Sequence, residues 1–122
     1  MGRLLLIGVA GAAGALCRLG VANVVGERTW PWATILVNVS GAFALGLLLA
    51  WATTRWSPTV VGALGIGFLG SFTTFSTLAM DAVGLGEGDG APAAAGYLVA
   101  SVALGVLAAL LGQALGRSIT AA

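Results

Sequence analysis

Residues 67 to 78 of the chain read GFLGSFTTFSTL. This stretch places five hydroxyl side chains in the seven positions from Ser71 to Thr77, in a segment otherwise made of glycine, leucine and phenylalanine. Glycine, serine and threonine favour a helix less than alanine or leucine does, and hydroxyls compete for backbone hydrogen bonds. We therefore expect a helix that is interrupted within this stretch.

The composition around this stretch is that of a membrane protein. Of the 122 residues, 59% are hydrophobic and only 7% are charged, and the mean hydropathy is +1.06. About a quarter of the residues in soluble domains are charged, so this chain cannot build a water-soluble surface. Four apolar stretches approach or exceed the ~20 residues that a helix needs to cross a bilayer core. The helices are expected at residues 4–25, 33–51, 60–83 and 93–115 of a single domain covering 1–122.

The segments between the expected helices hold turn-forming residues and most of the charges. Tryptophans at the expected helix ends are typical of the aromatic belt of a membrane protein. They are Trp30, Trp32, Trp51 and Trp56.

The first apolar stretch also resembles a secretory signal, because an arginine precedes it and small residues follow at positions 13 to 15. However, it continues to Val25, and the rest of the chain is itself apolar. A first membrane helix is therefore the simpler interpretation. Cys17 is the only cysteine, so the sequence predicts neither a disulfide nor a cysteine metal site.

The arginines between the helices indicate the orientation only weakly. Arg3, Arg55 and Arg117 fall on one side of the membrane and Arg28 on the other, which favours both termini in the cytoplasm. A bias of three to one leaves insertion in both orientations open.

Few groups in the expected helices can titrate. The chain has no histidine or lysine, and of its four acids only Asp81 could lie even partly within the membrane. Proton-coupled transporters and cation pores rely on ionisable side chains at depth, so both classes are disfavoured.

Two polar residues in the first helices have alternative interpretations. Arg18 lies about seven residues before its helix ends, so it either extends to the interface or lines a water-filled vestibule that attracts anions. Asn38 either joins two helices by a hydrogen bond or, with Thr34 one turn earlier, forms a stripe of neutral donors. Such a stripe suits an anion that has lost its water.

The third helix has glycines that lead into the run of hydroxyls, and we expect it to unwind near its centre. Irregular backbone at membrane depth is tolerated where protein or water surrounds it, and its carbonyls often hold an ion. Alternatively, each hydroxyl bonds to the carbonyl four residues earlier and the glycines only permit close packing, as Gly112 and Gly116 can in the fourth helix. The ring edge of Phe75 can face an anion or simply pack.

Three motifs together resemble the small bacterial fluoride channels of the Fluc or CrcB family. They are GALCR at 14–18, VNVSGAF at 37–43 and GFLGSFTTFST at 67–77, and they cover the first three helices. The resemblance implies an all-α fold of four transmembrane helices with a break in the third, paired as an antiparallel, dual-topology dimer in the bacterial cell membrane. It implies a passive channel that exports cytoplasmic fluoride, not an enzyme, with fluoride, a second subunit and the lipid bilayer as partners and no nucleic acid.

The resemblance also assigns roles to individual residues. It makes Gly70 and Thr73 the carbonyl donors to a structural sodium ion at the dimer centre. It makes Asn38 a pore donor to fluoride, Arg18 a vestibule charge and Phe75 the first ring of a phenylalanine pair, with Ser76 and Thr77 on the adjoining polar track. Ser101 is the fourth-helix hydroxyl of the pathway by its distance from the third-helix motif, and Leu78 takes the position of the second ring. The donor stripe on the second helix adds Thr34 to the expected fluoride pathway.

One position departs from the family pattern. Leu78 stands where the family usually has the second phenylalanine. Either leucine suffices beside the ion, or a paralogue of opposite orientation completes the pores. The sequence leaves open a homodimer or a heterodimer with a paralogue.

Two other functions also remain open from the residues. A small proton-coupled exporter of the multidrug type would require a membrane carboxylate, for which Asp81 is the candidate. A structural subunit of a membrane assembly would use the hydroxyls and glycines for packing alone.

Overall fold

The computed structural model describes residues 1–122 and contains helices and short turns. Four helical spans are long and apolar enough to cross a membrane, which confirms the predicted all-α, four-span architecture. The elements are α1 (Gly2–Val25), α2 (Trp32–Trp51), η1 (Ala52–Thr54), α3 (Pro58–Gly62), η2 (Ala63–Leu69), α4 (Gly70–Phe72), α5 (Phe75–Gly88) and α6 (Ala91–Ala121).

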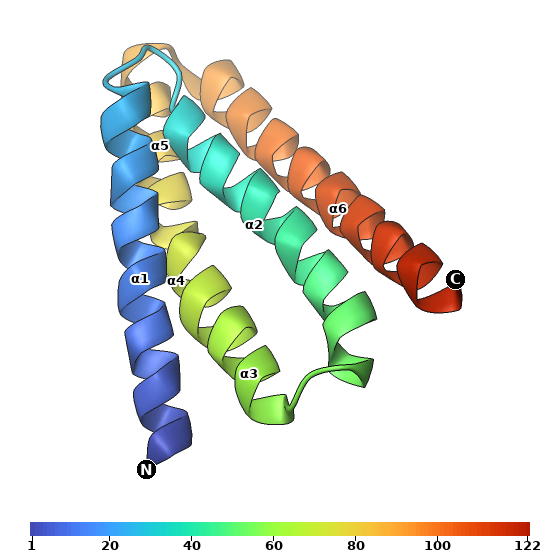
Figure 1. Ribbon diagram of the computed structural model, residues 1–122. Helices are drawn as coiled ribbons and strands as arrows, with labels where there is room; N and C mark the ends of the chain where they lie inside the picture. The colour runs from blue at the N-terminus through green and yellow to red at the C-terminus, as the bar shows by residue number, and fades with distance from the viewer.

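The helices run alternately up and down (Figure 1). Both termini and the α2–α3 connection lie at one end of the molecule, and the α1–α2 and α5–α6 connections lie at the other. The third span, made of α3, η2, α4 and α5, packs against α1 along its first half and against α6 along its second half. α2 packs along α6.

The third and fourth spans extend beyond their predicted bounds. α5 continues to Gly88 rather than residue 83, because Leu85 is buried between α2 and α6 and holds the glycine-rich last turn in place. The predicted turn segment thereby shortens to Asp89 and Gly90, and Gly90 has φ of 93°, which favours glycine. α6 runs to Ala121 rather than residue 115, since no proline or glycine follows Gly116 to end it.

Glycines allow α2 and α6 to approach closely. A Cβ atom at Gly112 would lie 2.1 Å from the carbonyl oxygen of Phe43, and one at Gly46 would lie 2.2 Å from that of Ala109. Small residues at such crossings let membrane helices pack backbone to backbone. The packing role expected for Gly112 and Gly116 is therefore confirmed.

The first half of the third span packs against α1 in the same way. A Cβ atom at Gly14 would lie 2.1 Å from the carbonyl oxygen of Phe68, which is in η2. The η2 segment is a π-helix, a wider coil that is rare in proteins and frequent near functional sites. The irregularity expected from the glycines thus begins before the hydroxyl run.

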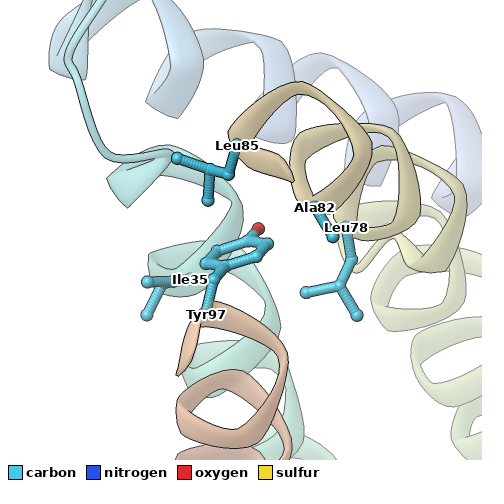
Figure 2. Close-up of a cluster of buried hydrophobic side chains, with 5 residues drawn as sticks. All are labelled: Ile35, Leu78, Ala82, Leu85 and Tyr97. Carbon is cyan, nitrogen blue, oxygen red and sulfur yellow. The ribbon is translucent and has the colours of Figure 1, made fainter. Parts of the chain in front are cut away.

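A cluster of buried side chains joins α2, α5 and α6. Figure 2 shows the ring of Tyr97 between Ile35 of α2 and the side chains that α5 presents. Tyr97 is fully buried, and its ring and that of Trp30 meet edge to face, with 5.9 Å between centroids. The members of the cluster are Ile35, Leu78, Ala82, Leu85 and Tyr97.

Candidate functional site

The third span breaks between α4 and α5. Thr73 has ψ of 158° and Thr74 has φ of −150° and ψ of 119°, so both are extended rather than helical. Thr74 caps α5, since its hydroxyl accepts a hydrogen bond of 3.2 Å from the backbone N–H of Thr77. Threonine is a preferred residue at this capping position. The predicted break is confirmed and lies inside the hydroxyl run.

Asn38 of α2 holds the break open. Its Nδ2 donates to the carbonyl of Thr74 at 3.0 Å, and its Oδ1 accepts from the N–H of Thr74 at 2.7 Å. In an uninterrupted helix, that N–H would donate to the carbonyl of Gly70. The side-chain amide therefore replaces the helical partner of the Thr74 N–H, and Thr74 can leave the helix without an unpaired backbone group of its own.

Gly41, one turn after Asn38, gives the break its room. A Cβ atom at Gly41 would lie 2.3 Å from the Cγ2 atom of Thr73. Thr73 is further held by its hydroxyl, which donates to the carbonyl of Leu69 at 2.9 Å. Two positions of α2 thus accommodate the break. The amide of Asn38 pairs with its backbone, and the absence of a side chain at Gly41 leaves room for Thr73.

The break places helix ends of opposite polarity inside the membrane span. The end of α4 presents backbone carbonyls, and the hydrogen bonds made outside the regular helices do not use those of Gly70 or Thr73. The start of α5 presents backbone N–H groups, which carry partial positive charge. A cation is therefore favoured beside Gly70 and Thr73, and an anion is favoured at the start of α5.

A first cavity of about 240 Å³ lies between α1, α2 and the start of α5. Its polar lining combines the guanidinium of Arg18 with the side chains of Thr34, Thr74 and Thr77. A fixed positive charge beside a helix N-terminus attracts anions. The structure therefore brings Arg18 to the part of the break that favours negative charge.

A second cavity of about 340 Å³ lies on the other side of Thr74, between α2 and the third span. Phe75 is 81% exposed beside it, whereas Leu78 is 8% exposed and packs into the core cluster of α2, α5 and α6. The predicted site residues that line this cavity are Asn38, Gly70, Thr73, Phe75 and Leu78.

Thr74 lines both cavities and lies between the two groups of predicted site residues. Thr34 and Asn38 are one turn apart on α2, yet Thr34 lines the first cavity and Asn38 the second. Ser76 and Ser101 line neither. Ser101 is buried in α6, and its hydroxyl has no hydrogen-bond partner in the protein. The expected polar residues thus divide between two compartments of one chain.

A hydrogen-bond network around Asp81 was not predicted. The hydroxyl of Thr34 donates to Oδ2 of Asp81 at 2.6 Å, and the hydroxyl of Tyr97 donates to the same oxygen at 3.0 Å. The network ties α5 to α2 and α6, and Thr34 consequently offers only lone pairs to the first cavity. Asp81 is the only acid within an expected helix and Tyr97 the only tyrosine, but no pattern in the sequence pairs them.

Comparison with known proteins places this geometry in a family. The family model described as CrcB-like protein, Camphor Resistance (CrcB), matches residues 5–113. The match includes the break, both cavities and the Asp81 network. It also extends through most of α6, where the sequence motifs were least specific.

Individual relatives agree with the family match. The chain is 46% identical to fluoride-specific ion channel FluC 2 of Moorella thermoacetica, over 88% of this chain and 91% of the relative. It is 48% identical to fluoride-specific ion channel FluC 1 of Symbiobacterium thermophilum, over 91% and 94%. It is 37% identical to fluoride-specific ion channel FluC of Rhizobium meliloti, over 97% and 98%. This chain is therefore a multi-pass bacterial membrane protein that belongs to the CrcB family.

Proposed function

We propose that this chain is the subunit of a fluoride-selective passive channel that exports fluoride from the cytoplasm and relieves its toxicity. The observation that carries the proposal is the cavity in which Arg18, the hydroxyl of Thr77 and the start of α5 converge. The names of the relatives, fluoride-specific ion channels, supply the identity of the anion.

The chemistry of the first cavity suits fluoride. Fluoride is small and strongly hydrated, so a narrow path must replace its water with protein donors and keep carboxylates away. The nearest carboxylate, Asp81, has one oxygen occupied by the hydroxyls of Thr34 and Tyr97. The cavity thus holds the guanidinium of Arg18 and the hydroxyl of Thr77 beside the N-terminus of α5, while the acid behind Thr34 is engaged by other donors.

Downhill transport is the second part of the proposal. The chain has no histidine or lysine, and Asp81 of α5 is tied to α2 and α6 rather than free to shuttle a proton. A channel of this kind drains fluoride along its own gradient. A proton-coupled exporter would instead require Asp81 to gain and lose a proton in every cycle.

We also propose that a sodium ion binds to the carbonyls of Gly70 and Thr73. Both groups lie at the end of α4, and the N–H that would have occupied the Gly70 carbonyl is taken by Asn38. Carbonyl oxygens of broken membrane helices suit Na⁺. The ion would supply a positive charge that neutralises the end of α4. A second, antiparallel subunit would bring the same pair of carbonyls to a shared centre.

The second subunit is either a copy of this chain or a paralogue. Phe75 is 81% exposed beside the second cavity, which supports a partner on this face. Leu78 is buried in its own core cluster, so a second aromatic ring, where one is needed, would come from the partner. The numbers 1 and 2 in the names of the relatives are consistent with paired paralogues.

The test is efflux from liposomes that contain the purified protein and are loaded with fluoride. After an ionophore relieves the membrane potential, a fluoride electrode should record rapid release, while chloride-loaded liposomes should release little. Absence of fluoride release, or equal release of chloride, would contradict the channel. A pH gradient should not drive fluoride uptake, and if it does, the proton-coupled exporter replaces the proposal. Release of no ion at all would leave a structural role.

The role of Asn38 is tested separately. Asn38→Asp places a carboxylate beside the carbonyl of Thr74 and the second cavity, so fluoride release should fall strongly. Asn23→Asp is the matched control, because Asn23 is the other asparagine and is exposed on α1. Undiminished release in Asn38→Asp would remove Asn38 from the pathway but not the channel function.

A further inference from the structure

Charged side chains are segregated between the two ends of the molecule. Arg3, Arg55 and Arg117 lie at the end that holds both termini and the α2–α3 connection. The four acidic side chains of the chain lie toward the opposite end, together with Arg28. The first end is thus cationic without a neighbouring acidic side chain. It is therefore available to an anion from outside the chain.

Arg55 is the most constrained arginine of this end. Its guanidinium carbon lies 5.7 Å from the centroid of the Trp51 ring, and its Nη1 donates to the hydroxyl of Thr120 at 3.4 Å. Trp56 packs edge-on against Trp51, with 5.0 Å between ring centroids. A guanidinium stacked on an aromatic ring keeps most of its N–H donors free, and its planar fork matches phosphate oxygens. Tryptophans of this kind lie at headgroup depth in a bilayer.

An apolar groove opens at Trp56, the residue that follows Arg55. It has a volume of about 460 Å³, lies between the second half of α2 and the first half of the third span, and is lined chiefly by side chains such as Leu49, Trp56 and Val61. It starts at the level of Trp56 and Pro58 and reaches Leu45 and Ile66 deeper in the spans. The groove therefore connects the tryptophan-rich end to the interior of the bilayer.

We propose that this end binds one anionic phospholipid, with its phosphate on Arg55 and one acyl chain in the groove. Charge favours an anionic lipid, because Arg3 and Arg117 lie at the same end and Arg3 reaches α3, with Nη2 3.8 Å from where a Cβ of Gly62 would be. Basic residues at a membrane surface attract anionic lipids additively. The bound lipid would join α2, the α2–α3 connection and the end of α6, all of which contact this site.

The test measures retention of phosphatidylglycerol and phosphatidylcholine by the purified protein, by native mass spectrometry over a lipid titration. The wild type should retain phosphatidylglycerol in preference to phosphatidylcholine, and Arg55→Gln should weaken that retention about fivefold, the effect of one basic residue near a lipid surface. Arg28→Gln removes the same charge at the opposite end and should change nothing. Val61→Phe fills the groove and should also reduce retention while Arg55 remains.

Several outcomes would overturn the proposal. Equal loss in Arg55→Gln and Arg28→Gln would indicate general charge attraction, and equal retention of both lipids would remove the phosphate from the recognition. Competition by inorganic phosphate at equal concentration would identify a free-anion site instead of a lipid site. If Val61→Phe weakens the dimer and leaves lipid retention unchanged, a second subunit covers the groove. Because the readout is lipid mass, none of these results depends on whether the protein conducts fluoride.

Discussion

Asn38 and Thr74 are joined by hydrogen bonds that run in opposite directions, from Nδ2 to the Thr74 carbonyl and from the Thr74 N–H to Oδ1. This is the pattern that two backbone segments make in a β-ladder, here formed by a side-chain amide. Thr74 is 9% exposed, so its backbone groups have little access to solvent. The amide therefore satisfies a buried break that would otherwise carry unpaired donors and acceptors.

Replacement of Asn38 by leucine should destabilise the protein. Leucine keeps the approximate volume but leaves the N–H and carbonyl of Thr74 without Asn38, at about 1–3 kcal/mol for each buried polar group. The thermal unfolding midpoint in detergent should fall clearly. Asn23→Leu, on the exposed face of α1, should leave it unchanged. Equal midpoints for both variants would mean that the break does not depend on the amide.

The fit between Gly41 and Thr73 can be tested by rescue. Gly41→Ala would place a Cβ atom 2.3 Å from Cγ2 of Thr73, so it should displace the break, lower stability and reduce fluoride release. Thr73→Ser removes that methyl group and keeps the hydroxyl that donates to Leu69. The double variant Gly41→Ala with Thr73→Ser should recover most of the loss.

Recovery specific to Thr73→Ser would identify the clash as the cause. The conservative change Thr74→Ser serves as the control, since it leaves Cγ2 of Thr73 in place. If the double variant with Thr74→Ser recovers equally, or if neither recovers, Gly41 acts through some contact other than Thr73.

The Asp81 network should behave as a coupled unit. Thr34→Val removes a hydrogen bond to a charged group while nearly preserving shape, at a cost of about 1.5–3 kcal/mol. Asp81→Asn weakens the acceptor, so Thr34→Val should cost less in the Asp81→Asn background, and the difference is the coupling energy of a double-mutant cycle. Unfolding midpoints and denaturant titrations of the purified variants measure it. Strict additivity would contradict the bond.

Much of the fold could be predicted from the sequence, because bilayer thickness and hydrophobic length set the spans almost alone. The break was also predictable, since hydroxyls and glycines concentrate where Thr73 and Thr74 leave the helix. The end of α5 could not be predicted. The glycines after residue 83 indicate a turn in the sequence, whereas burial of Leu85 in the core cluster keeps the segment helical. Local propensity was overridden there by a tertiary contact.

The residues of the candidate site could be predicted from the sequence, but their division between two cavities could not. Asn38 was recognised as a polar residue that needs partners, but its partner proved to be the backbone of Thr74, which no side-chain pattern reveals. The donation from Thr34 to Asp81 depends on the approach of α2 to α5, so it appears only in three dimensions. Roles of Phe75 and Leu78 that involve a second subunit remain predictions.

Replacement of Ser101, whose hydroxyl has no partner, should affect stability and transport differently. Ser101 is 7% exposed and its Oγ makes no hydrogen bond within the chain, so Ser101→Ala should leave the unfolding midpoint unchanged or raise it slightly. If Ser101 belongs to the fluoride pathway, the same change should lower fluoride release from liposomes. A lower midpoint would reveal a structural partner, and unchanged release would remove Ser101 from the pathway.

The crossing of α2 and α6 should tolerate no side chain at Gly112. Gly112→Ala would bring a Cβ atom to 2.1 Å from the carbonyl oxygen of Phe43, which is backbone and cannot rotate away. The helices would have to separate, at a cost of about 1–3 kcal/mol or more. The matched control is Gly105→Ala, on the same helix, where no atom lies within 4 Å of the Cβ position.

Gly105→Ala should be neutral or stabilising, since alanine is more favourable in a helix than glycine by about 1 kcal/mol. The unfolding midpoints of the variants should therefore move in opposite directions from the wild type, and a parallel shift would mean that α6 is not fixed to α2 at this crossing.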